Sequence, residues 1–119
     1  QRLVRKICPD CREPYHPDPR LLGSLANSIT IQPGARLFHG RGCEECNQTG
    51  MRGRIGICEL LRINEPMRKL IAQRPTADQI QQAAAADHIS MRHDGIEKIL
   101  AGITTAEEVL RVTQGMDED

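Results

Sequence analysis

The apolar residues of the chain follow two patterns, short alternating runs in the first half and helical spacing in the second. Residues 1–7 predict a short strand, and residues 54–63 predict the clearest strand of the chain. Between these strands, residues 19–26 predict a short helix, and residues 29–38 predict an extended segment around a Pro-Gly turn. The first half is therefore expected to consist mainly of short strands and turns.

Four short amphipathic helices are predicted in the second half, and they are expected to form a small bundle. Each is preceded by a residue that can cap its N-terminus, and these residues are Asn64, Thr76, Ser90 and Thr105. Gln79 and Glu108 stand where they would complete capping boxes with the two threonines. The first helix is expected over residues 65–74, the second through Asp87, and the third up to Gly102. Strands followed by helices indicate an α+β fold, with a frayed acidic end at residues 116–119.

Aromatic residues are nearly absent from the chain. Tyr15 and Phe38 are the only two, and there is no tryptophan. Large rings supply much of the buried surface of small domains, so the first half, rich in Pro, Gly and Arg, has little with which to build a core. A bound metal would compensate for that shortage.

Two Cys-x-x-Cys pairs, Cys8/Cys11 and Cys43/Cys46, have the spacing of a four-cysteine metal site. Together they supply the four soft ligands of a closed tetrahedral zinc site, in which the metal has a structural role because no position is left for a substrate. The helix at 19–26 is expected to pack over this site. The odd total of five cysteines argues against a fully disulfide-paired secreted module and fits a metal site in a reducing cytosol. A thioredoxin-like redox role is disfavoured, because neither pair lies between a strand and a clear helix.

The fifth cysteine and the four histidines form no catalytic set. Cys58 lies within the second predicted strand, which favours a buried core position over a role as a fifth ligand. His16 and His39 could replace a missing thiolate, but four thiolates already complete the shell. His88 and His93 lie at a helix junction and are expected on the solvated surface.

The formal charge of zero conceals an uneven distribution. Residues 1–58 carry nine Lys/Arg against five Asp/Glu, and residues 59–119 carry seven against eleven. The basic half could contact nucleic acid or phosphate. Two oppositely charged surfaces of one assembly explain the split as simply, since the basic residues are scattered and lack aromatic partners for base stacking. Arg52 and Arg54 lie on a glycine-rich turn, where they could bind phosphate or form a solvated pair.

Several sequence signals are missing. The chain contains no G-x-x-x-x-G-K-[ST] phosphate loop and no nucleophile-base-acid arrangement, so we do not expect it to be a catalyst by itself. No apolar run approaches the roughly 18 residues of a transmembrane helix, and there is no signal-peptide pattern. Because the chain opens on Gln1 within a strand-like segment, we expect it to be a fragment or an excised domain.

Four stretches of the chain resemble the C-terminal part of the secretion ATPases of the type II secretion and type IV pilus assembly family, the general secretion pathway protein E group. They are residues 1–11, 42–50, 53–61 and 94–112, which cover both halves in the family's order. Met51 and Cys58 depart from the family pattern, because tyrosine is expected at both positions. Neither departure affects metal binding.

The resemblance implies a zinc-binding insertion between two strands of the ATPase's nucleotide-binding domain, followed by a helical C-terminal subdomain. Residues 1–63 would be the insertion with its two flanking strands, which would lie side by side at its base, and residues 64–119 would be the helical subdomain. Arg54 matches a family arginine placed near the nucleotide or the neighbouring subunit. The residues that bind ATP and magnesium in the parent protein would precede this chain.

The resemblance also implies a cytoplasmic hexamer, peripheral at the inner membrane, that drives pseudopilus or pilus assembly. Its partners would be the rest of the ATPase, neighbouring subunits and inner-membrane platform proteins, with no direct contact to nucleic acid. One alternative is a free-standing zinc module that binds nucleic acid or unfolded polypeptide, because residues 43–50 are faintly similar to a chaperone zinc knuckle. Salt-dependent binding of oligonucleotides would favour that alternative. A redox protein is the other alternative, and disulfide reductase activity would favour it.

Overall fold

Three two-stranded antiparallel ladders organise the described part of the chain in the computed structural model, which describes residues 1–25, 35–85 and 88–113. They pair β1 (Arg2–Ile7) with β4 (Met51–Ile57), β2 (Arg12–Tyr15) with β3 (Leu37–Gly40), and β5 (Leu60–Leu61) with β6 (His88–Ile89). In the β1–β4 ladder Val4 lies opposite Ile55 and Arg5 lies opposite Arg54. This pairing confirms the expectation that the two predicted strands lie side by side.

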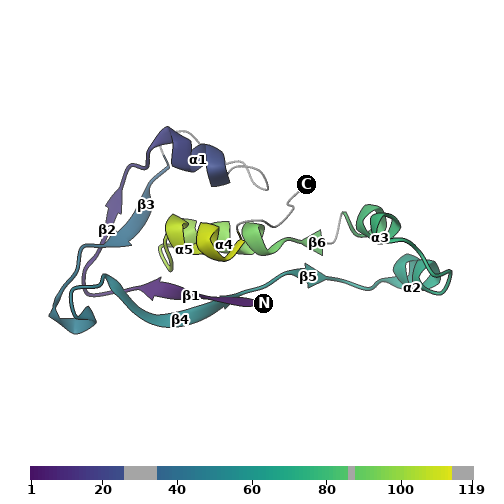
Figure 1. The fold of residues 1–119 in the computed structure, drawn as a ribbon, viewed down its shortest axis with the longest axis horizontal. Coiled ribbons are helices and arrows are strands. Elements are labelled where there is room, and N and C mark those ends of the chain that lie inside the picture. Colours follow the sequence, from purple (N-terminus) through teal and green to yellow (C-terminus); the bar gives the residue numbers. More distant parts are fainter. Residues whose placement is uncertain (26–34, 86–87, 114–119) are drawn as a thin grey trace.

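Residues 8–50 leave the end of β1 and return to the start of β4, so this segment is an excursion from one ladder. The backbone N–H of Cys8 donates to the carbonyl of Gly50 at 3.0 Å, which holds the two ends of the excursion together. The β2–β3 ladder lies within it (Figure 1). Of the predicted extended segment 29–38, residues 29–34 with the Pro-Gly turn lie outside the described residues, as do residues 116–119.

The predicted strand 54–63 is wrong in its extent. β4 begins earlier, at Met51, and ends at Ile57, and β5 is a separate strand that pairs with β6. The break lies at Cys58, whose backbone N–H donates to Oδ2 of Asp94 at 2.8 Å. Cys58 is exposed, so the predicted core position is also wrong.

The described residues form five α-helices, which are α1 (Pro19–Leu25), α2 (Glu65–Ile71), α3 (Ala77–Ala84), α4 (Met91–Leu100) and α5 (Ala106–Thr113). Side chains of Asn64, Thr76 and Ser90 cap α2, α3 and α4 as predicted, and Gln79 completes its capping box. The helix predicted over 65–74 ends at Ile71. The helix predicted through Asp87 ends at Ala84, and Asp87 lies outside the described residues.

The second predicted capping box is only half formed. Thr105 Oγ1 accepts a hydrogen bond from the backbone N–H of Glu108 at 3.2 Å. The carboxylate of Glu108 does not return to Thr105, because it binds Arg5 on β1 and Arg111 instead. The cap therefore orients α5, while the glutamate connects that helix to the first strand.

The buried core lies where α4 and α5 pack on the first half of the chain. One cluster consists of Leu25, Leu37, Ile96, Ile99, Ala106 and Val109. A second consists of Val4, Ile57, Met91 and Val112. Because Leu25 joins the first cluster, α1 packs against α5, and the expectation that this helix covers the metal site is wrong.

The helices of the second half form two pairs and not one bundle. α4 packs on α5, and α2 packs on α3. Figure 1 shows the α2–α3 pair at one end of the molecule and the β2–β3 ladder at the other, along a longest dimension of 56 Å. The predicted α+β class, with short antiparallel strands and a helical second half, is confirmed. In the described part of the chain, no helix has the length and apolar character needed to span a membrane.

Candidate metal centre

The four cysteines of the two Cys-x-x-Cys pairs come together at the base of the excursion. Cys8 and Cys11 flank the turn between β1 and β2, and Cys43 and Cys46 belong to the turn around the short 3-10 helix η1 (Glu44–Cys46). Their four Sγ atoms all lie within 4.8 Å of one another. Three of the four are buried, and Cys43 is partly exposed.

The spacing of the sulfur atoms fits a tetrahedral metal ion. The Sγ atoms of Cys8 and Cys43 are 3.8 Å apart, those of Cys11 and Cys46 are 3.8 Å apart, and those of Cys43 and Cys46 are 3.7 Å apart. Four sulfurs at about 2.3 Å from a central zinc ion would lie roughly 3.8 Å from one another. The chain therefore places four thiol groups where they could hold one metal ion.

Backbone amides support this arrangement around Cys46. Its Sγ accepts hydrogen bonds from the N–H of Cys43 at 3.3 Å and of Gly50 at 3.1 Å. Gly50 has a φ of 76°, and a Cβ added to Gly40 on β3 would lie 2.2 Å from the Gly50 carbonyl oxygen. Glycine is therefore required where β3 passes the second cysteine turn.

The thiols differ in how readily the polypeptide ionises them. Burial raises the pKa of Cys11 to about 12 and also raises the pKa of Cys43. Burial also opposes ionisation of Cys46, but the N–H groups of Cys43 and Gly50 and the neighbouring thiols outweigh it and lower the pKa of Cys46 to about 6. The chain alone thus favours one thiolate, and a bound dication would supply the charge that ionises the others.

Comparison with known proteins adds the context of this centre. A sequence model described as Type II/IV secretion system protein matches residues 1–111. The chain belongs to the Type II/IV secretion system protein family. It is 43% identical over 114 residues to "Type II secretion system protein E" of Dickeya dadantii, and 44% identical over 114 residues to the protein of the same name in Pseudomonas aeruginosa. It is also 43% identical over 114 residues to "Type IV pilus assembly ATPase PilB" of Thermus thermophilus.

These relatives are much longer than the chain. The matches cover 96% of the chain but 22% of each of the two secretion proteins, and 95% of the chain but 13% of the pilus protein. The chain therefore corresponds to about a fifth of the secretion proteins it matches.

In this member of the Type II/IV secretion system protein family, Arg54 lies exposed on β4. Among the described residues its side chain forms no hydrogen bond or ion pair, and it lines a cavity of about 340 Å³ together with Arg5 and Arg52. Arg52 pairs with Asp10 at 3.6 Å, and more than half of each side chain is exposed. The predicted contact of Arg54 with nucleotide or a neighbouring subunit stays a prediction.

The histidines are dispersed and join neither the metal centre nor one another. His39 pairs with Glu13 at 3.1 Å, and His16 is exposed. His88 pairs with Glu59 at 2.7 Å and His93 with Glu97 at 3.2 Å, so both form surface ion pairs when protonated.

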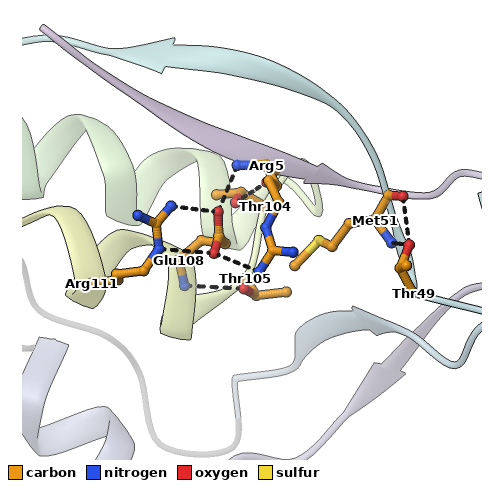
Figure 2. Close-up of polar contacts among 7 residues, drawn as sticks. All are labelled: Arg5, Thr49, Met51, Thr104, Thr105, Glu108 and Arg111. Atoms are coloured by element: carbon orange, nitrogen blue, oxygen red, sulfur yellow. Dashed lines mark hydrogen bonds and ion pairs between the residues drawn. The ribbon is translucent and has the colours of Figure 1, made fainter.

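Sequence reasoning missed the environment of Glu108, whose side chain is only 4% exposed. Its carboxylate accepts hydrogen bonds from the Arg5 backbone N–H at 2.7 Å, Arg5 Nη2 at 3.1 Å and Arg111 Nη2 at 3.0 Å (Figure 2). Thr104 Oγ1 donates to the Arg5 carbonyl at 2.7 Å and adds a second connection to β1. Burial opposes ionisation of Glu108, but the hydrogen bonds from Arg111 and Arg5 and the charge of Arg5 lower its pKa to about 2. No sequence signal marked a contact between residues so far apart in the chain.

Proposed function

We propose that the chain is the zinc-binding and helical portion of an ATPase that powers pseudopilus assembly in type II secretion, and that it supports contacts within the oligomer or with the membrane platform. The observation that carries this proposal is the tetrahedral spacing of four thiols at the base of an excursion between paired strands, in a chain whose relatives are named as secretion and pilus ATPases. The pilus assembly ATPase is the second candidate, because the 43% identity to the pilus relative equals that to the Dickeya dadantii secretion protein.

Zinc is the metal that the donor set favours. Four cysteine sulfurs in tetrahedral spacing suit zinc, whereas the hard oxygen ligands that magnesium and calcium prefer are absent from this cluster. A closed shell of four thiolates supplies folding free energy and leaves no site for a reactant. The role of Cys8, Cys11, Cys43 and Cys46 is therefore to hold the excursion on the β1–β4 ladder.

We assign ATP and magnesium to the rest of the parent protein. Within the chain, residues 1–63 are proposed as the zinc-binding insertion with its flanking strands and residues 64–119 as the helical subdomain, with the boundary between β5 and α2. Arg54 is proposed to reach a nucleotide or a neighbouring subunit, supported by its exposure on β4 and by its lack of a partner among the described residues. The parent protein would act as a cytoplasmic hexamer, peripheral at the inner membrane through the platform proteins.

The test compares two cysteine variants of the full-length protein that carries this chain. Cys46→Ser is expected to lose zinc, with a loss of assembly and ATP hydrolysis together, because the excursion then separates from the strand ladder. Cys58→Ser is the matched control, since Cys58 is exposed and lies outside the cluster, and it should keep both zinc and activity. Zinc retained by Cys46→Ser would contradict the assignment of the centre. Full ATP hydrolysis and assembly after loss of zinc would contradict its supporting role.

A further inference from the structure

We propose that a second, unassigned site between β1 and the α4–α5 turn binds a phosphate group. A cavity of about 340 Å³ opens there and is lined by Lys6, Arg12 and Arg52 together with Ile7, Pro9, Gly102 and Ile103. Three cations from three different segments therefore surround one hollow. None of the four clustered cysteines lines this site, and phosphate binding there does not depend on the proposed function.

The cations are available to a ligand to different degrees. Lys6 is exposed, and its ammonium group forms no hydrogen bond or ion pair with the described part of the chain. Arg52 has one anionic partner, Asp10 at 3.6 Å, with both side chains more than half exposed. An ion pair this exposed is weak, so a ligand with more charge can replace Asp10.

Arg12 is already fixed in position. Its Nη1 donates to the Gly102 carbonyl at 3.1 Å, and its guanidinium carbon lies 5.5 Å from the centre of the Phe38 ring. Gly102 has a φ of 79°, which favours glycine, and a Cβ there would lie in tight contact with Arg12 Nη1, at 3.1 Å. A guanidinium held in this way loses little freedom when it binds an anion.

The lining of the cavity also includes the apolar side chains of Ile7 and Ile103. The Ile7 backbone N–H donates to the Ile103 carbonyl at 2.8 Å, which joins the end of β1 to the α4–α5 turn. The Ile7 N–H and the Ile103 carbonyl are therefore already paired, and recognition is left to the charged side chains of the lining.

Phosphate is the anion that these features fit. Arginine binds phosphate oxygens through two parallel N–H groups, and lysine adds a point charge. The volume lies at the lower end of the range for small-molecule sites. The chemistry suits a phosphomonoester or diphosphate, whether it comes from a soluble compound or from a lipid headgroup. The neighbouring cavity at Arg54 shares only Arg52 with this one.

The test is a titration of the 119-residue chain, loaded with zinc and labelled with ¹⁵N, with sodium pyrophosphate at constant ionic strength. Saturable shifts are expected at the backbone amides of Ile7, Arg52 and Ile103. Lys6→Gln should weaken binding about five- to tenfold, because it removes one charge-assisted contact. Arg20→Gln is the matched control, because Arg20 is an exposed residue of α1 outside the cavity, and it should change affinity less than twofold. Dispersed amide spectra must show that each variant is folded.

A second pair of variants tests the competing carboxylate. Asp10→Asn should tighten pyrophosphate binding two- to threefold by releasing Arg52, whereas Glu45→Gln, an exposed acidic position with no contact to the cavity, should not. Equal tightening by both would contradict the site, because it would indicate general attraction to a basic surface. Equal weakening of pyrophosphate binding by Lys6→Gln and Arg20→Gln would also contradict the site. Weakening by Arg54→Gln without an effect of Lys6→Gln would contradict it as well.

A vesicle experiment, compared with the pyrophosphate titration, distinguishes the source of the phosphate. Vesicles of phosphatidylcholine with and without phosphatidic acid are sedimented with the chain and with Lys6→Gln. Binding to pyrophosphate alone identifies a soluble ligand, and Lys6-dependent binding only to vesicles that contain phosphatidic acid identifies a lipid headgroup. Absence of Lys6-dependent binding in both the pyrophosphate titration and the vesicle experiment overturns the proposal.

Discussion

Replacing Glu108 by glutamine removes a buried charge without changing the shape of the side chain. In the folded chain the pKa of Glu108 is lowered from its ordinary value of 4.5 to about 2 by Arg111 and Arg5, against the opposing effect of burial. A difference of this size corresponds to about 3 kcal/mol of folding free energy above pH 4.5. Because 56% and 58% of the Arg5 and Arg111 side chains are exposed, solvent screening reduces the expected loss for Glu108→Gln to about 2 kcal/mol.

The assay is urea unfolding of the zinc-loaded chain at pH 7, followed by circular dichroism. Glu107→Gln is the matched control, since Glu107 is the preceding residue of α5 and is exposed, and it should cost less than about 0.5 kcal/mol. Equal effects of the two substitutions would refute the reasoning, because they would assign the loss to the net charge of the helix.

The pH dependence has a definite sign. A carboxylate whose pKa is lowered by folding stabilises the protein above its unfolded pKa, and that stabilisation is lost as the pH falls through the folded value. The difference in stability between the native chain and Glu108→Gln should thus be constant above about pH 5 and shrink between pH 4.5 and about 2. Acid also protonates the cysteine thiolates of both chains, so the difference between the chains at each pH is the informative quantity. A difference that grows on acidification would contradict the assignment.

Three further experiments test the close contacts at glycines and the accessibility of the cysteine thiols. Gly95→Ala should destabilise the chain by about 1–2 kcal/mol, because the added Cβ would lie 2.6 Å from Val109 Cγ1 and the clash outweighs the gain in helix propensity. Gly23→Ala is the control, because no atom lies within 4 Å of the added Cβ, and it should be neutral or slightly stabilising in the same unfolding assay. Gly40→Ala should lower zinc affinity in a chelator competition, because its Cβ would meet the carbonyl of the second cysteine turn at 2.2 Å, and unchanged affinity would contradict the required close approach. In the zinc-loaded chain a maleimide should modify Cys58 alone, as mass spectrometry of peptides can show, and early modification of any cluster thiol would count against a closed centre.

Local signals in the sequence predicted the parts of the fold that depend on neighbouring residues. Asn64, Thr76 and Ser90 cap the helices they were expected to cap, because a cap needs only a side chain and an amide two or three residues away. The paired Cys-x-x-Cys turns likewise predicted the thiol cluster, since the ligand type and spacing are fixed within each turn.

Contacts between distant residues escaped sequence reasoning. The strand predicted over 54–63 follows an apolar pattern, but Asp94 accepts a hydrogen bond from the Cys58 backbone N–H, and β4 ends at Ile57. Glu108 satisfied the pattern of a capping box, yet the proximity of Arg5 redirects its carboxylate to β1. The helices were expected to form one bundle because their apolar faces are alike. Instead, α4 and α5 pack on the strands, and α2 packs on α3. In each case the competing partner is supplied by tertiary structure.

We propose that four cysteine thiolates bind one structural zinc ion at the base of the excursion. Zinc analysis of the purified, reduced chain combined with X-ray absorption at the zinc edge tests it most directly. The account predicts one zinc per chain with four sulfur neighbours at about 2.3 Å. A chain that folds without zinc, or a metal shell containing nitrogen or oxygen, would contradict it.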